Sequence, residues 1–344
     1  MRAGLVGCGV VAGYGHIPAL AGPGTPDIEL VALCDSDPTR LAVAGERWGI
    51  SRAYADYHDL VSQPDIDLIA ICTHVDSHGP ITLAAAEHGK HVLCEKPLAD
   101  TEQTALRMCE EMDEAGLILG TGFILRFARP VSLMKQALAE GRIGGLRVFR
   151  SVTNWWGGGH RGAHPGRHER FMAEGGPMFG EAVHHLDLLR FFSGQEIVDV
   201  QAAGARVDPF DWPDHSIAHC RLEDGGLGII ENGWAYGHKS KDPVMSRETE
   251  LIGERGVIRY RRADREVVEI YGWDETTVLD APEEKEFPAM YNTLVASVEA
   301  GAVQPPLASG WDGLRAQQAV AGALESIRGW LVPPPDTPFG AATQ

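Results

Sequence analysis

The chain has few cysteines, few basic residues and no long apolar run, and each shortage excludes a class of protein. Only six of its 344 residues are cysteines, with no Cys-x-x-Cys pair, which is typical of a reduced, cytoplasmic protein. Lys and Arg number 30 against 48 Asp and Glu, and the net charge of −18 argues against nucleic acid or an anionic membrane as a partner. Without an 18-residue apolar stretch or a basic leader, we expect no membrane span and no signal peptide.

The length predicts two domains, because a single core stops growing at roughly 250 to 300 residues. Short apolar strands alternate with helical patterns at the start of the chain, which predicts a doubly wound α/β domain over residues 1–121. Strands that are apolar on both faces are typical of a buried parallel sheet. We expect them in the segments AGLVGCG, IELVALCD, IDLIAICT, KHVLCEKP and LILGTGFI.

Residues 122–330 have a different pattern, which predicts an α+β domain with a large, mostly antiparallel open sheet, and residues 331–344 predict a loose, proline-rich tail. Strands are expected from Ile197 to about Val278, with a hairpin turning at EDGG. The segments FGEAVHHLDLLRFFSG, YNTLVASVEAG and WDGLRAQQAVAGALESIRGW each predict one helix of this domain. Helices on one face leave the other face of the sheet uncovered, so we expect another copy of the same sheet to cover it in an oligomer.

The segment GLVGCGVVAGYGH contains five glycines, and three of its residues fit a dinucleotide-binding loop. Gly7 allows a tight turn, Gly9 lets the backbone approach a pyrophosphate, and Ala12 lets the next helix pack on the strand. Asp35 ends the second strand, where a carboxylate can accept hydrogen bonds from a ribose diol and repel a 2′-phosphate. The pattern predicts NAD as cofactor, and Arg40 leaves NADP open.

Lys96 follows a buried strand in HVLCEKPLA, at the edge where ligands bind in open α/β sheets. Apolar neighbours and a positive nicotinamide ring would both lower its pKa, which suits a proton-transfer group. A surface lysine that caps a loop is an equally good interpretation of the residue type alone.

These motifs, together with VALCDSDPTR, ICTHVDSHGPITLAAAEHGKHVLCEKPLADT and GGPMFGEAVHHLDLLRFFSG, resemble the Gfo/Idh/MocA oxidoreductases over residues 1 to about 240. The resemblance implies a Rossmann domain, an α+β domain, and hydride transfer between nicotinamide and a secondary hydroxyl of a sugar, cyclitol or related polyol. It implies that Lys96 binds the reacting hydroxyl, that His184 is the general acid/base, and that Asp187 closes the family's D-x-G-x-H-x-x-D pattern.

Two positions depart from the family pattern. Gly180 stands where the family has its first aspartate, and Glu181 could supply the missing carboxylate because residues 181 and 184 share a helix face. The family often has a Thr-Pro-Asn segment after the fourth strand, and this chain has Thr73, His74 and Val75 there. Thr73 and His74 are still expected to line the nicotinamide. The residues expected at the cofactor are Gly7, Gly9, Val10, Val11, Asp35, Ser36, Arg40, Cys72, Thr73, His74, His78, Glu95 and Lys96.

Further candidates surround the substrate. The residues expected to contact it are Glu181, Asp187, His185, Arg126, Trp155 and Trp156. Three of these predictions have alternatives: Arg126 could form a salt bridge, His185 could lie on a helix face, and either tryptophan could fill the core. Tyr236 is a weaker candidate. Residues 155–176 are predicted to form a long loop. His160, His164 and His168 are spaced by four, which on a helix could form a metal site, but the glycines and Pro165 oppose a helix there. We therefore expect these histidines in a polar substrate-lining loop or a solvated loop, and no metal site.

Three functions compete. The first is the NAD(P)-dependent dehydrogenase described above. The second keeps the fold and cofactor but uses transient oxidation to eliminate a glycosidic bond. The third is a dinucleotide-sensing regulator without catalysis, against which the presence of both Lys96 and His184 argues.

Overall fold

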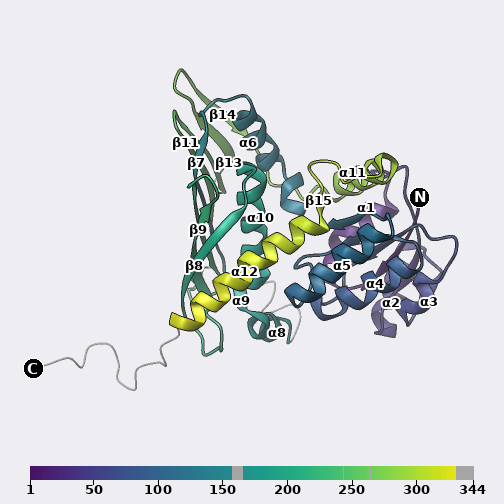
Figure 1. Cartoon of the computed structure of the whole chain (residues 1–344). Helices are drawn as coiled ribbons and strands as arrows, with labels where there is room; N and C mark the ends of the chain where they lie inside the picture. The colour runs from purple at the N-terminus through teal and green to yellow at the C-terminus, as the bar shows by residue number, and fades with distance from the viewer. Residues whose placement is uncertain (157–165, 243, 263–264, 331–344) are drawn as a thin grey trace, which may run out of the picture.

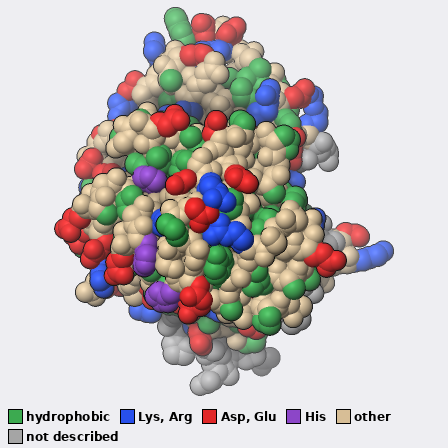
Figure 2. Space-filling model, turned by 90° about the vertical axis from the view of Figure 1, so that its right-hand side faces the viewer, with side chains coloured by type: hydrophobic (Ala, Val, Ile, Leu, Met, Phe, Trp, Pro, Cys, Tyr) green, Lys and Arg blue, Asp and Glu red, His purple; other side chains and the backbone are tan. Residues whose placement is uncertain are grey.

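Two sheets, each with its own helices, organise the chain in the computed structural model, which describes residues 1–156, 166–242, 244–262 and 265–330. Figure 1 shows them side by side, with the long helix α12 (Gly310–Trp330) running from one to the other. On the end of the N-terminal domain shown in Figure 2, acidic and basic side chains are interspersed, and a small basic group near the centre is bordered by acidic side chains.

The N-terminal sheet has the order β15-β6-β5-β4-β1-β2-β3, with every pair parallel except β15–β6, and confirms the doubly wound prediction. Its parallel strands are β1 (Arg2–Val6), β2 (Glu29–Cys34), β3 (Ala53–Tyr54), β4 (Leu68–Ile71), β5 (His91–Cys94) and β6 (Leu119–Thr121). Its first helices are η1 (Ala12–His16), α1 (Ile17–Ala21), α2 (Pro38–Trp48), α3 (Tyr57–Val61), η2 (Val75–Ser77), α4 (His78–Glu87) and α5 (Glu102–Glu114). The strand β3 and the helix α3 were not predicted, because both are too short for a periodic pattern.

Local chemistry sets both ends of α2. The Asp37 side chain accepts hydrogen bonds from the main-chain N–H groups of Thr39 and Arg40 and so caps α2, which has Pro38 in its first turn. Gly49 then ends α2 with φ +68°, a left-handed conformation that glycine adopts at little cost.

One helix belongs to a different domain from the one we predicted. Helix α11 (Phe287–Ala300) packs into the N-terminal core, where Phe287, Met290 and Leu294 are buried among residues of β1 and α1. The strand β15 (Ala308–Ser309) then adds to the edge of the N-terminal sheet by pairing with β6. The chain therefore returns to its first domain before α12.

The second sheet has the order β14-β13-β12-β11-β7-β10-β9-β8 and is antiparallel throughout except for the pair β7–β10. Its strands are β7 (Leu146–Asn154), β8 (Ile197–Ala205), β9 (His215–Leu222), β10 (Leu227–Gly233), β11 (Ser246–Gly253), β12 (Val257–Arg262), β13 (Glu266–Tyr271) and β14 (Thr276–Asp280). Strands β9 and β10 form the predicted hairpin across residues 223–226. The remaining helices of the described residues are η3 (Ile124–Phe127), α6 (Arg129–Ala139), α8 (Arg167–Glu174), α9 (Gly176–Gly180) and α10 (Ala182–Ser193).

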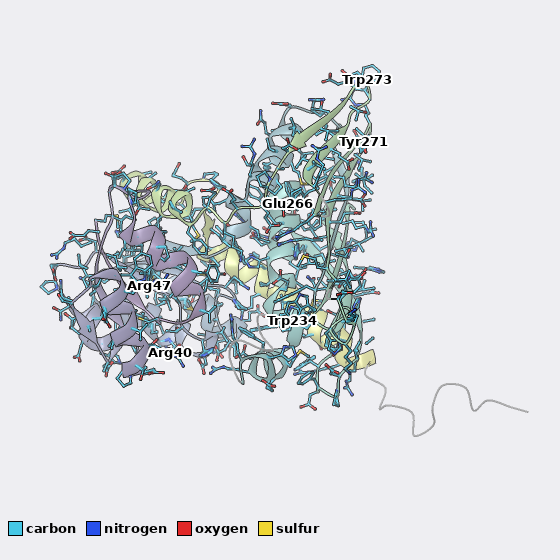
Figure 3. The ribbon with its side chains drawn as sticks, turned by 180° about the vertical axis from the view of Figure 1, so that it is seen from behind. Arg40, Arg47, Trp234, Glu266, Tyr271 and Trp273 are labelled. Carbon is cyan, nitrogen blue, oxygen red and sulfur yellow. The ribbon has the colours of Figure 1, made fainter. Side chains whose placement is uncertain are left out.

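Helices α6, α10 and α12 cover one face of this sheet, and Figure 1 shows no helix of the described chain on the other. The close packing of α10 is visible at Gly228 of β10, where a Cβ would lie 2.4 Å from the Leu189 side chain. Figure 3 shows Tyr271 and Trp273 at the end of the sheet remote from the N-terminal domain.

Two local predictions in the second domain were wrong. The segment 155–176, predicted as a loop, contains the amphipathic helix α8. The glycines that precede α8 in the sequence indicated a loop, so the helix was not predicted. The segment predicted as one helix is divided into α9 and α10 at Glu181, which has φ −118° and ψ −47°.

Candidate active site

The glycine loop joins β1 to a helix that begins directly after Gly9. A Cβ on Gly7 would lie 2.7 Å from the main-chain carbonyl of Cys72, so only glycine lets β1 end this close to the end of β4. A Cβ on Gly9 would meet no described atom within 4 Å, so the loop is open on that side. The first N–H groups of the helix, from Val10 and Val11, have no helical partner of their own. This bare backbone fits a dinucleotide pyrophosphate.

Asp35 lies at the end of β2, buried beside this loop. One carboxylate oxygen accepts the Cys8 N–H at 2.7 Å and the other accepts the Asp37 N–H at 2.8 Å. Each oxygen keeps lone-pair capacity for a ribose hydroxyl, so the carboxylate is both fixed and available. Ser36 and Arg40 are exposed next to it, and Arg40 pairs with Asp37 at 3.2 Å. The placement agrees with the cofactor prediction for these residues without testing it.

The end of β4 is tied to the turn that carries Lys96. The buried His78 ring contacts the Pro97 carbonyl through Nδ1 at 3.0 Å and the Thr73 carbonyl through Nε2 at 3.3 Å. Burial lowers the pKa of His78, so the ring is neutral and only one of its two nitrogens carries a proton to donate to a carbonyl. Cys72 is buried behind this edge, whereas Thr73 and His74 are partly or fully exposed at it.

Lys96 crosses from the first domain to the second. Its Nζ donates a hydrogen bond to the Gly180 carbonyl at 2.6 Å. In an unbroken helix that carbonyl would accept the N–H of residue 184, but the His184 N–H bonds to the Glu181 carbonyl instead, at 3.0 Å. The interruption at Glu181 therefore frees a carbonyl that holds the Lys96 ammonium within one helical turn of His184.

Electrostatics at this junction set the charge states of the three groups. Burial lowers the pKa of Lys96, and the Glu181 and Glu95 carboxylates oppose that effect. Burial, reinforced by the Lys96 charge, holds the pKa of His184 well below its usual 6.5, so its imidazole is neutral and able to accept a proton. Burial raises the pKa of Glu181, but Lys96 and Arg247 more than offset this and lower it overall, so Glu181 is ionised.

The ring of Trp234 explains why residue 180 carries no side chain. A Cβ on Gly180 would lie 2.9 Å from this ring, which is on the side of the sheet that faces the N-terminal domain (Figure 3). An aspartate at this position could not keep the Trp234 packing. Among the carboxylates, that of Glu181 has the largest effect on the pKa of Lys96, and its side chain is 22% exposed.

His185 has a different position from the predicted substrate contact. Its two ring nitrogens lie 2.8 Å from the Ser151 hydroxyl and 3.1 Å from the Thr153 hydroxyl, both on the inner face of β7. Burial lowers its pKa to about 4, so it is a neutral residue that fastens the start of α10 to the sheet. The Glu181 carboxylate lies 4.0 Å from its Nε2, which leaves His185 behind the site rather than in it.

Arg126 and Asp187 also depart from the prediction that they contact substrate. They form a bidentate ion pair, with Nε–Oδ2 at 2.8 Å and NH2–Oδ1 at 2.6 Å. Their side chains are 6% and 1% exposed, so both are enclosed by protein. Asp312 of α12 lies 3.6 Å from Arg126 and 2.9 Å from Arg190 and extends the pair into a network. The salt-bridge alternative holds for Arg126, and the pair fastens η3 to α10.

The remaining candidates have mixed outcomes. Trp155 is half-buried and Trp156 is 37% exposed, both directly after β7. The Tyr236 main-chain N–H donates a hydrogen bond to the Trp155 carbonyl at 3.3 Å, which places Tyr236 beside them. The contact of these three residues with substrate stays a prediction. His168 is buried in α8 against the rings of Phe210 and Trp234 rather than in a polar loop. His160 and His164 lie outside the described residues.

Sequence reasoning missed two cations near Glu181 and His184. Arg247 on β11 pairs with Glu283 at 2.7 Å, and the Lys285 Nζ donates to the Tyr14 hydroxyl at 3.3 Å. Both positive charges act to lower the pKa of His184. Neither residue is in a motif, and both come from segments more than 60 residues after His184, so no local signal could have indicated them.

Among the described residues, we find no group of three or more His, Cys, Asp or Glu side chains that could hold a metal ion. Within the same residues, every helix is too short or too polar to span a bilayer.

Comparisons with known proteins show the family of this chain. Residues 1–123 match the model of the oxidoreductase family with an NAD-binding Rossmann fold, and residues 131–259 match that of the GFO/IDH/MocA C-terminal domain. The chain is 29% identical to myo-inositol 2-dehydrogenase of Thermotoga maritima over 91% of this chain and 92% of that protein. It is 30% identical to inositol 2-dehydrogenase 1 of Saccharopolyspora erythraea over 95% and 94%.

Solved structures share the whole fold. A probable dehydrogenase from Thermotoga maritima superposes with a TM-score of 0.79 at 27% identity, over 96% of this chain and 97% of that one. A levoglucosan dehydrogenase in complex with NADH and levoglucosan gives a TM-score of 0.82 at 21% identity over the same shares, which shows a common fold. Together the two matched regions cover most of the sequence, and the chain belongs to the GFO/IDH/MocA family of NAD-binding oxidoreductases.

Proposed function

We propose that this protein is an NAD-dependent dehydrogenase that transfers a hydride between nicotinamide and a secondary hydroxyl of a sugar, cyclitol or related polyol. The observation that carries the proposal is the convergence of the Lys96 ammonium and the neutral His184 imidazole from separate domains, through the Lys96–Gly180 hydrogen bond. The named relatives that align over nine tenths of their length are inositol dehydrogenases, which supports the substrate class.

Each residue has a distinct part in this reaction. When bound, the nicotinamide supplies the hydride acceptor, and the Gly7–Val11 loop and Asp35 would hold its dinucleotide. Lys96 donates a hydrogen bond to the reacting hydroxyl and stabilises the negative charge that develops on its oxygen. His184 accepts the hydroxyl proton, because burial and the Lys96 charge keep it unprotonated. We assign the missing carboxylate of the family pattern to Glu181, which balances the Lys96 charge.

A substrate panel tests this proposal. Pyranoses, cyclitols and sugar acids are each offered with NAD and with NADP, and the absorbance of the reduced ring is followed. We expect turnover with at least one polyol and a preference for NAD. Tight NAD binding without turnover of any polyol would favour a regulator, and release of free sugar without NADH accumulation would favour glycosidic elimination.

The oligomeric state and location are part of the same proposal. The uncovered face of the large sheet carries exposed apolar side chains, including Ile217, Leu227 and Val278, at 38%, 40% and 55% exposure. We assign this face to a second copy of the chain, in a homodimer or homotetramer. All six cysteines are unpaired, which supports a cytoplasmic location. Light scattering on the native protein and on an Ile217→Glu variant tests the interface: the variant is expected to have a lower mass, and a monomeric native protein would contradict the assignment.

A further inference from the structure

Three buried polar side chains form a hydrogen-bonded chain directly behind Lys96. The His16 ring lies 2.7 Å from the Tyr291 hydroxyl through Nδ1 and 2.9 Å from Glu95 Oε1 through Nε2. The other oxygen of Glu95 accepts the main-chain N–H of Lys96 at 3.1 Å. His16, Glu95 and Tyr291 are 1%, 7% and 0% exposed, so the chain is closed to solvent.

The three residues come from distant parts of the sequence. His16 is the last residue of η1, a π-helical turn that follows the glycine loop, and such turns are frequent at functional sites. Glu95 follows β5 and precedes Lys96, whereas Tyr291 comes from α11, the helix that returns to the N-terminal domain. Only the full fold brings them together, so no local sequence signal indicates a role for His16 or Tyr291.

Packing leaves the Glu95 carboxylate little freedom to move. A Cβ on Gly122 would lie 2.8 Å from Glu95 Oε1, so the carboxylate is pressed against this backbone. The His16 ring packs edge-on against Phe287, with ring centres 4.9 Å apart, and a Cβ on Gly15 would collide with the same phenyl ring at 2.4 Å. A polar chain held this tightly in the core has a defined geometry.

The Glu95 carboxylate also acts on the charge of its neighbour. Burial raises the pKa of Glu95, but its interaction with His16, helped by the Lys96 charge, more than offsets that effect, so the group is ionised. The negative charge in turn raises the pKa of Lys96 against the lowering effect of burial. Position and charge are therefore both transmitted through one carboxylate.

We propose that His16 and Tyr291 are positioning residues, which hold the ionised Glu95 carboxylate against the Lys96 main chain and so fix the direction and the charge of the Lys96 ammonium. The consequence for turnover rests on the proposed dehydrogenase function, whereas the effect on Lys96 itself does not. All three side chains are buried, and their hydrogen bonds join them to one another and to the Lys96 main chain.

The first test measures Lys96 without any substrate. Competitive acetylation of the full-length protein at a series of pH values, read by mass spectrometry, gives the pKa of Lys96 in the native protein and in Glu95→Gln. We expect the pKa in Glu95→Gln to be lower by about one unit or more, because a neighbouring opposite charge typically contributes 1 to 3 units. Tyr291→Phe keeps the Glu95 charge and is expected to move the pKa of Lys96 much less.

The second test measures turnover with the polyol identified in the substrate panel. Tyr291→Phe and His16→Gln are each expected to lower kcat by roughly 2- to 10-fold, the value of one hydrogen bond, with the dissociation constant for NAD unchanged. Because both act through Glu95, the double variant should lose little more than the worse single variant. In Glu95→Gln, the alkaline limb of the kcat/KM profile should move to lower pH as Lys96 loses its proton earlier.

Tyr54→Phe is the matched control, since it removes a tyrosine hydroxyl bonded to Arg52 at 3.3 Å in the same domain, and we expect it to change none of these values. An unchanged Lys96 pKa in Glu95→Gln would overturn the proposal, as would additive losses from His16→Gln and Tyr291→Phe. If Glu95→Gln does not fold, the test uses Tyr291→Phe, which removes only one oxygen atom. A lower kcat with unchanged NAD affinity would then support the proposal, and an unchanged kcat would overturn it. If no polyol is oxidised, the proposed function fails, while the acetylation result still decides the effect on Lys96.

Discussion

Replacing Asp187 by asparagine distinguishes a buried ion pair from a substrate contact. The asparagine would keep the shape of the side chain but leave the Arg126 guanidinium without its bidentate partner. Removing one member of a buried pair typically costs 3 to 5 kcal/mol. Asp312 remains 3.6 Å from Arg126 and would compensate part of the charge, so we expect a loss of about 3 kcal/mol in the free energy of unfolding. At roughly 2 to 4 °C per kcal/mol, the melting temperature should fall by about 6 to 12 °C.

Urea unfolding and thermal melting measure this loss, and steady-state kinetics on the folded variant at low temperature measure its effect on substrate. The matched control is Asp280→Asn, which breaks the Arg265–Asp280 pair, with side chains 72% and 79% exposed, and is expected to cost no more than about 1 kcal/mol. We expect the KM of the folded Asp187→Asn protein to stay within about twofold of the native value. A large rise in KM with unchanged stability would refute the structural role and restore Asp187 as a substrate ligand.

Three further outcomes follow from the site, and a fourth from the core. Lys96→Ala should abolish hydride transfer and leave NAD affinity largely intact in a fluorescence titration, so near-normal turnover would contradict the role of Lys96. Asp35→Ala should weaken NAD and reduce discrimination against NADP, as measured by the ratio of the two dissociation constants. The pKa of His184 lies well below 6.5, so protonation of this residue should not lower kcat/KM between about pH 7.5 and 6.5. An inflection near pH 6.5 that disappears in His184→Asn would contradict the neutral state of His184. Phe287→Ala should destabilise the N-terminal domain by about 3 to 5 kcal/mol in urea unfolding, whereas no loss would contradict the placement of α11 in that core.

The elements that could be predicted are those whose signal lies within a few residues. Alternation of apolar strands and helices indicated the parallel sheet. The same local reasoning placed Lys96 at the carboxyl edge of the sheet, because the end of β5 is visible in the sequence.

What could not be predicted depends on partners far along the chain. Whether Arg126 reaches a substrate or an aspartate depends on where α10 packs, and the local sequence around either residue is compatible with both outcomes. Helix α11 has an apolar pattern that fits any core, and only the shape of the N-terminal domain selects it. The break at Glu181 arises beside Trp234, more than 50 residues later, so the pattern of the segment itself predicted one continuous helix.

That break has a chemical consequence that a side-chain comparison alone would miss. The family pattern has an aspartate at position 180, and this chain has a glycine whose carbonyl, released from the helix, accepts a hydrogen bond from Lys96. A carbonyl orients the ammonium but does not neutralise it, so the charge must be balanced elsewhere, and Glu181 and Glu95 are the carboxylates that act on it. Glu181→Gln should therefore lower the pKa of Lys96, as measured by competitive acetylation, whereas a Gly180→Asp replacement should not rescue it, because its side chain would collide with Trp234. A stable Gly180→Asp/Glu181→Gln protein with native activity would contradict this reasoning. It would show that the site accepts an aspartate at position 180, as in the family pattern, and that Trp234 does not exclude a side chain there.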